Sequence, residues 1–156
     1  MDYHCQEGSF SLPEGFQDRT VNMFVLGASV PGPLSITLSR DTHLPGEDLV
    51  DYLKRQLKQL AAKLSGYTVL EQREVLLGVA APVAGLQIDA YYLNSKRPIH
   101  QRQAAFFTGC GRVLVFACTS QADFTAEQRC EWEQLLSSFT PRGLDQNDPT
   151  GAGEQE

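Results

Sequence analysis

The chain has 156 residues, of which 42% are hydrophobic and 21% charged, and its formal net charge is -6 at pH 7. This length favours one domain that buries a core without disulfide or metal cross-links. The negative charge argues against nucleic acid or an anionic membrane surface as a partner, unless a local basic patch overrides the average.

Cysteine spacing and the N-terminal residues favour the cytoplasm. The four cysteines have no CxxC or other metal-ligand spacing, and we interpret them as reduced thiols: Cys5, Cys110, Cys118 and Cys130. The sequence MDYHCQEGSF lacks the basic and apolar regions of a signal peptide. The longest apolar stretch, Val75–Leu86, contains Pro82 and falls short of the about 20 residues that span a bilayer. We therefore expect no direct membrane insertion.

Alternating residues near the N-terminus predict two pairs of strands. Tyr3–Leu12 alternates loosely and indicates a short strand pair or a bulged strand. Two apolar runs follow, Thr20–Leu26 and Leu34–Ser39, joined by the Gly- and Pro-rich connection Gly27–Pro33, as in a β-hairpin with a long loop. Because strand side chains alternate, three apolar residues share one face: Val21, Met23 and Val25. One face of the hairpin is expected to meet the core, which leaves an apolar face to spare.

The clearest helix is predicted over Glu47–Leu64. Its apolar residues recur at helical spacing and form one stripe: Val50, Leu53, Leu57, Leu60, Ala61 and Leu64. Acidic residues crowd its start and basic residues its later turns, the polarity that the helix dipole favours. Gly66 is expected to end it as a left-handed cap. Gln56 flanks the stripe, either as a solvated residue or as an amide at the border of a binding face.

Four more strands are predicted beyond this helix: Tyr67–Leu77, Val83–Asn94, Ile99–Thr108 and Arg112–Thr119. Short turns make the last three antiparallel neighbours in a meander, which curls because strands twist. One face of the third strand is mixed: Gln101, Gln103, Ala105 and Phe107. This face either meets solvent or offers hydrogen bonds within an apolar patch.

The C-terminal part predicts a second helix and a polar tail. Thr125 and Gln128 have the spacing of a capping box, and the helix they open carries a core-facing stripe: Trp132, Leu135, Leu136 and Phe139. Residues 142–156 are predicted to be a disordered tail. Residues 1–141 are therefore expected to form one α+β domain.

No catalytic, metal or cofactor site is predicted. The three histidines are far apart without an HxxxH or HExxH pairing: His4, His43 and His100. No GxSxG elbow or Walker loop occurs, and Gly27–Gly32 lacks the lysine and the following helix of a phosphate-binding loop. Cys110 lies at a predicted hairpin tip, which offers neither a neighbouring base nor shelter from water, so we interpret it as a turn residue.

The order of several segments resembles a known family. The succession SFSLPEGFQDRTVNMFVL, ITLSRD, DYLKRQLKQL and QRQAAFF is similar to the DUF1795 or DcrB-like group, over roughly residues 3–141. Within that group it resembles the Eag proteins, the effector-associated chaperones of type VI secretion systems. Unlike periplasmic DcrB, this chain shows no lipoprotein signal.

The resemblance implies a curved antiparallel β-sheet backed by two main helices, as in PsbP- and DcrB-like proteins, in a homodimer without enzymatic activity. It also implies a cytoplasmic chaperone or adaptor whose concave surface binds and shields the N-terminal transmembrane helices of a toxin effector before export. Such helices aggregate in water because each exposes a continuous apolar surface. Carried over position by position, the effector-helix binding residues are Val21, Met23, Thr37, Gln56, Leu64, Gln103 and Ala105. Thr37 and Ala105 are smaller or more polar than the bulky apolar residues usual in the family.

Two alternatives remain open at this point. A small-molecule-binding protein or enzyme of DcrB-like fold would have a deep pocket lined by convergent polar groups. A protein-interaction module would bind a folded partner along an exposed sheet edge. Without the resemblance, apolar residues such as Val21, Met23 and Leu64 would be interpreted as ordinary core.

Overall fold

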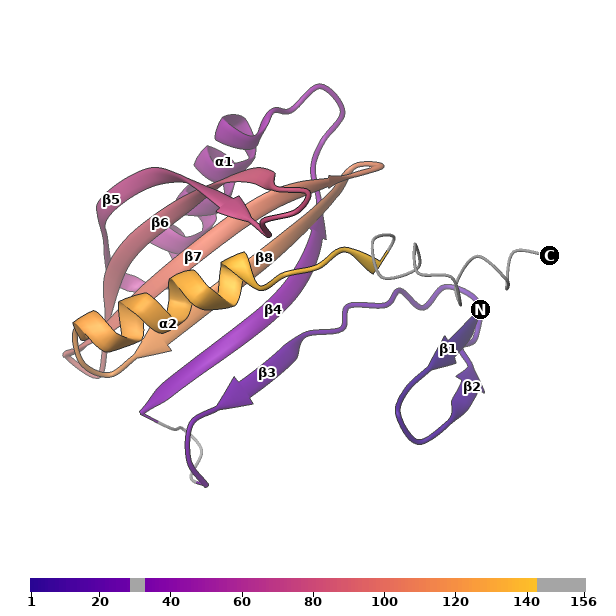
Figure 1. Cartoon of the computed structure of the whole chain (residues 1–156), viewed down its shortest axis with the longest axis horizontal. Coiled ribbons are helices and arrows are strands. Elements are labelled where there is room, and N and C mark those ends of the chain that lie inside the picture. Colours follow the sequence, from indigo (N-terminus) through magenta and orange to yellow (C-terminus); the bar gives the residue numbers. More distant parts are fainter. Residues whose placement is uncertain (29–32, 143–156) are drawn as a thin grey trace.

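A twisted antiparallel sheet with a helix on each face forms the body of the protein (Figure 1). The structure, a computed structural model, describes residues 1–28 and 33–142. In chain order the elements are β1 (Asp2–His4), β2 (Ser9–Ser11), β3 (Asn22–Val25), β4 (Leu34–Thr42), α1 (Leu49–Lys63), β5 (Ser65–Leu77), β6 (Val83–Asn94), β7 (Arg97–Gly109), β8 (Arg112–Ser120) and α2 (Ala126–Ser137).

The main sheet has six strands in the order β3-β4-β8-β7-β6-β5, and every neighbouring pair is antiparallel. The last three strands form the predicted meander, which β5 extends by pairing with β6, and β4 pairs with β8 along nine residues of each strand. The chain leaves β4 near one edge and enters β5 at the opposite edge, so α1 crosses one face of the sheet on the way. The predicted α+β class and antiparallel sheet are confirmed.

Under α1 lies the first half of the core. Tyr52 and Leu53 of α1 are buried against one face of β6, β7 and β8, where their neighbours are Ile88, Ala90, Ala105, Val113 and Val115. Alternating residues of β7 and β8 point to the opposite face. Because both faces of these central strands are apolar, each face binds a helix.

The second half of the core lies under α2. Trp132 and Leu136 of α2 pack on this opposite face against Leu77, Ala104, Phe106, Phe116 and Cys118. A chain of polar contacts crosses this core: Trp132 donates to Gln87 at 2.8 Å, Gln87 donates to Asp89 at 2.9 Å, and Arg102 pairs with Asp89 at 3.2 Å. The two helices that were predicted to back the sheet therefore lie on opposite sides of it (Figure 1).

Helix boundaries differ from prediction in a few places. Asp48 caps α1 by accepting from the Asp51 N–H at 2.8 Å, and the predicted Thr125–Gln128 capping box opens α2. Gly66 was wrongly predicted as the cap of α1: Leu64 is already extended, and Gly66 adopts its positive φ of 63° inside β5. A side chain there would also crowd Leu93.

The apolar stripe of α1 is shifted from the predicted one. Tyr52 and Leu53 are its buried residues, whereas Val50 is 42% exposed and Ala61 is exposed. Tyr52 takes the place of Val50 in the buried stripe, because the side of α1 that carries Tyr52 and Leu53 is the side that packs on the sheet.

The strands β1 and β2 form the predicted short pair, as a separate two-stranded hairpin. Figure 1 shows it apart from both helices, connected to the sheet by an extended segment. A hydrogen bond of 3.0 Å joins the Tyr3 and Thr20 hydroxyl groups, and Phe10 is half exposed. The central part of the predicted loop Gly27–Pro33, residues 29–32, and positions 143–156 of the predicted tail lie outside the described residues.

Candidate functional site

The helix α1 covers only part of its face of the sheet. It lies over β5, β6 and part of β7 and reaches Val113 and Val115 of β8. Across the rest of β7 and β8 and across β4 and β3, no helix of the described residues lies above the same face. We call this part the uncovered face; its side chains, none of them fully buried, are Met23, Val25, Ser35, Thr37, Ser39, Gln101, Gln103, Ala117 and Thr119. Strand register, which pairs residues across neighbouring strands, assigns all of them to the α1 side.

One row of this face runs straight across four strands. Met23 of β3 pairs with Thr37 of β4, Thr37 with Ala117 of β8, and Ala117 with Gln103 of β7. Residues paired in this way have side chains within contact distance of each other on one face. We call this row, Met23–Thr37–Ala117–Gln103, the strip. It contains three of the residues that the family resemblance implied, Met23, Thr37 and Gln103.

The outer end of the strip is apolar and exposed. Met23 is 62% exposed and Val21, just before β3, is 54% exposed. Fully burying a methionine or valine side chain is worth about 1.5–3 kcal/mol relative to leaving it exposed. Large apolar side chains at a sheet edge therefore favour association with another apolar surface.

The inner end of the strip offers hydrogen-bonding groups without charge. Gln103 is half-buried, and in the next row Val25, Ser35, Thr119 and Gln101 follow one another across the same four strands. The Oε1 atom of Gln101 is buried and accepts no hydrogen bond from the described residues. The face therefore combines small hydroxyl and amide groups with an apolar margin.

Gln56 stands where α1 borders the uncovered face. Its Nε2 donates to Asp41 Oδ2 in β4 at 3.2 Å, and the Tyr52 hydroxyl donates to the same oxygen at 2.8 Å. Burial, followed by the hydrogen bond to Asp41, raises the pKa of Tyr52 above its ordinary value, so the phenol keeps its proton at neutral pH. Gln56 is thus held at the β4 side of α1.

Two of the implied residues lie elsewhere. Ala105 has no exposed surface, because α1 covers it as part of the core, so its assignment to an effector-contacting surface is wrong for this structure. Leu64 is half-buried where α1 gives way to β5, at the sheet edge opposite β3. Sequence reasoning missed Ser35, Ala117 and Thr119, whose place on this face depends on the pairing of β4 with β8.

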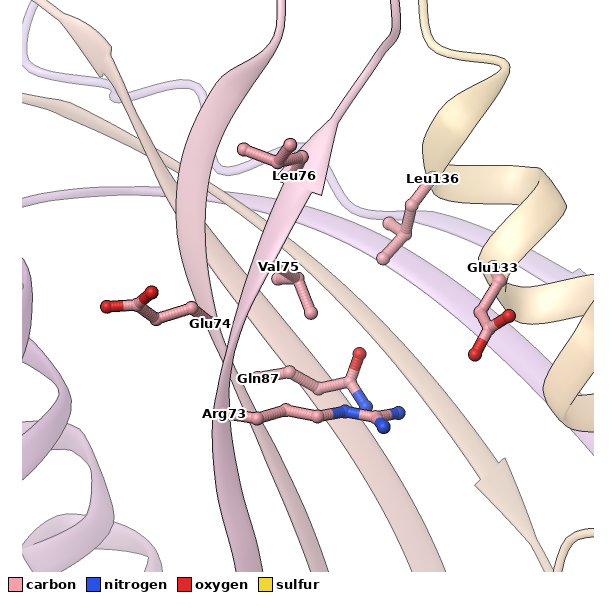
Figure 2. Close-up of a pocket in the computed structure, with 7 residues that line it drawn as sticks. All are labelled: Arg73, Glu74, Val75, Leu76, Gln87, Glu133 and Leu136. Carbon is pink, nitrogen blue, oxygen red and sulfur yellow. The ribbon is translucent and has the colours of Figure 1, made fainter.

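A recess of about 250 Å³ opens on the other side of the sheet, between β5, β6 and α2. In Figure 2, Arg73, Val75 and Gln87 point toward Glu133 and Leu136 of α2, whereas Glu74 and Leu76 point away. The amide of Gln87 already bonds with both Trp132 and Asp89. The charged side chains of Arg73 and Glu133 also line the recess, and Arg73 Nε is buried without a hydrogen-bond partner among the described residues.

Metal-binding groups and membrane spans were also sought in the described part of the chain. Within residues 1–28 and 33–142, no cluster of three or more His, Cys, Asp or Glu side chains is placed to hold a metal ion. Across the same residues, no helix combines the length and apolarity needed to cross a membrane.

Comparison with known proteins identifies the family. The family model DcrB matches residues 7–138. The protein Effector EagT6 of Pseudomonas aeruginosa is 26% identical over 141 residues, which cover 90% of this chain and 95% of EagT6. The crystal structure of PA94, a Pseudomonas aeruginosa protein of unknown function, superposes with a TM-score of 0.68 at 24% identity, covering 91% of this chain and 96% of that one. Since the family model spans most of its length, the chain belongs to the DcrB family.

Proposed function

We propose that the chain is a cytoplasmic chaperone of a type VI secretion system, which binds and shields the N-terminal transmembrane helices of an effector before export. It acts by binding and not by catalysis, and it works as a homodimer. Two lines support the proposal: similarity over nearly the whole chain to a protein named Effector EagT6, and the segment order that resembles the Eag chaperones.

The observation that carries the proposal is the strip Met23–Thr37–Ala117–Gln103. A helix made for a bilayer presents apolar side chains together with a few polar groups that normally bond to neighbouring helices. The strip offers the matching surface, with exposed Met23 at one end and the Gln103 amide at the other. Methionine suits varied clients because its side chain is flexible and polarizable.

The test compares two adjacent residues of β3. Met23 and Phe24 are 62% and 60% exposed, but as strand neighbours they point to opposite faces. The chain is co-expressed with the N-terminal, membrane-span-containing region of the effector encoded beside it. Met23→Ser is expected to weaken capture about tenfold, as the loss of one buried apolar side chain would. Phe24→Ser should leave capture unchanged.

The same pair distinguishes the alternative of strand addition. β3 is an edge strand, and a partner that pairs with its backbone would project side chains onto both faces. Equal losses in the two variants would therefore favour an edge-binding interaction module. Absence of capture by the wild-type chain would overturn the chaperone proposal.

The homodimer is tested by light scattering on the purified chain. The expected mass is twice the 17.2 kDa of one copy. A mass of one copy at micromolar concentration would contradict the dimer while leaving the binding face open to the test above.

A further inference from the structure

We propose that Asp41 is a positioning residue, which fixes the Gln56 amide so that its carbonyl oxygen, a hydrogen-bond acceptor, is the end offered to a bound helix. The inference rests on the function proposed above and makes it more specific. It predicts that the client helix carries an N–H or O–H donor at the point where it passes Gln56.

The geometry places two donors on one carboxylate oxygen. Tyr52 and Gln56 are one helical turn apart and project from the same side of α1. Both donate to Asp41 Oδ2, at 2.8 Å from the tyrosine hydroxyl and 3.2 Å from the amide nitrogen. Tyr52 is 2% exposed and packed in the core, so the helix and the end of β4 are held in a fixed relation.

The chemistry of the two groups removes the usual ambiguity of an amide. A glutamine side chain can present either its NH₂ donor or its carbonyl acceptor, and the two ends are nearly equal in shape. An ionised carboxylate accepts hydrogen bonds and donates none. The NH₂ end must therefore face Asp41, and Oε1 is the end turned away from it.

The position of Gln56 explains why this orientation matters for binding. Gln56 is half-buried on the side of α1 that borders β4, next to the uncovered face. An acceptor fixed there forms a hydrogen bond with a client donor, such as a serine or threonine hydroxyl. A purely aliphatic helix has no side-chain donor and forms no such bond. Asp41 thus adds selectivity without touching the client.

The experiment measures selectivity, which a merely structural role of Asp41 would not change. The probes are five synthetic 20-residue Leu/Ala helices. Four carry one serine at successive central positions, which together present it on every side of the helix, and one carries only alanine there. Dissociation constants are measured by fluorescence anisotropy in mild detergent. The wild-type chain should bind the best serine helix about fivefold more tightly than the alanine helix.

Asp41→Asn is expected to reduce this fivefold ratio to about one while the alanine helix binds as before. The new amide both donates and accepts, so it no longer dictates which end of Gln56 faces outward. Asp41→Ala, which leaves no group to hold Gln56, should do the same. The matched control Tyr52→Phe removes the other donor to Asp41 and should keep the ratio. Circular dichroism checks that each variant is folded.

The outcomes separate the two proposals. If the wild-type chain binds the helices and Asp41→Asn keeps the fivefold ratio, or if the wild-type chain shows no preference for serine, the positioning role is wrong and the chaperone function stands. If no helix binds the wild-type chain, the proposed function fails, and the positioning role fails with it.

Discussion

Trp132 donates a hydrogen bond of 2.8 Å from its indole Nε1 to Oε1 of Gln87, and both side chains are buried. The bond joins α2 to β6 and continues through Asp89 to Arg102. A buried polar chain of this kind stabilises the fold only while each member keeps its partner. The stability of the contact between α2 and the sheet should therefore depend on this bond.

Replacing Gln87 by leucine should lower the free energy of unfolding by about 2 kcal/mol. The change leaves the Trp132 N–H buried without an acceptor, which costs about 1–3 kcal/mol. Urea denaturation followed by tryptophan fluorescence measures the loss, since Trp132 is the only tryptophan. A change below 0.5 kcal/mol, the range of ordinary surface substitutions, would contradict the assigned importance of this bond.

Gly85 is expected to tolerate no side chain. An added Cβ would overlap the Phe106 ring and the Ala105 carbonyl oxygen, so Gly85→Ala forces β6 or β7 to shift. Overpacking of this kind costs about 1–3 kcal/mol. The matched control is Gly8→Ala, where an added Cβ meets nothing within 4 Å. Thermal unfolding should show a clear loss for the first variant and almost none for the second.

Acid sensitivity is predicted at the start of α1. Arg55 donates two hydrogen bonds of 2.9 Å to Glu47, and these contacts lower the pKa of the Glu47 carboxyl to about 2, below its ordinary 4.5. The unfolded chain therefore binds a proton here at higher pH than the folded one. The stabilisation is complete above pH 4.5 and is lost as the pH falls toward 2. Glu47→Gln should flatten the pH dependence of unfolding in that window, and an unchanged slope would refute the assignment.

Reactivity should divide the cysteines into two groups. Burial raises the pKa of Cys118 to about 11, which leaves almost no thiolate at neutral pH, whereas Cys5, Cys110 and Cys130 are exposed. Iodoacetamide followed by mass spectrometry is expected to modify three positions in the native chain and the fourth only after unfolding. Rapid native labelling of Cys118 would show that α2 does not cover it as described.

Gln103 on the uncovered face and Gln56 at its border should act together in binding. Gln56→Ala combined with Gln103→Ala removes two hydrogen-bonding amides, and we expect capture of the effector's hydrophobic region to fall about tenfold. Fold and dimer should remain intact, because both side chains are only partly buried. Unchanged co-purification would count heavily against a role for these amides.

Local sequence signals predicted most of the fold. Val83–Asn94 was predicted with the bounds that β6 has, and Thr125 with Gln128 opened α2 as expected, because alternation and capping depend on neighbouring residues. The pairing of strands that are distant in the sequence could not be predicted from local patterns. The pairing of β4 with β8 joins segments about 80 residues apart in the sequence, and no local pattern specifies it.

In the candidate site too, local features were predictable from the sequence and long-range packing was not. Alternation correctly gave Gln103 and Ala105 a common face of β7, yet one is half-buried and the other has no exposed surface. The difference arises because α1 covers Ala105 and leaves Gln103 at its margin. Helical spacing located α1 but not where it would lie on the sheet, and for the same reason Tyr52 was overlooked as a core residue.

Among the residues that the structure describes, the uncovered face contains no ionisable side chain, although the protein as a whole carries a net charge of -6. The proposed contacts of these side chains with a client therefore involve neither proton uptake nor release of counterions, and Asp41 is the carboxylate that lies at their border with α1. The net negative charge of the molecule meanwhile opposes association beyond the proposed dimer. The proposed binding of apolar helices and the resistance to aggregation would thus depend on separate parts of one small protein.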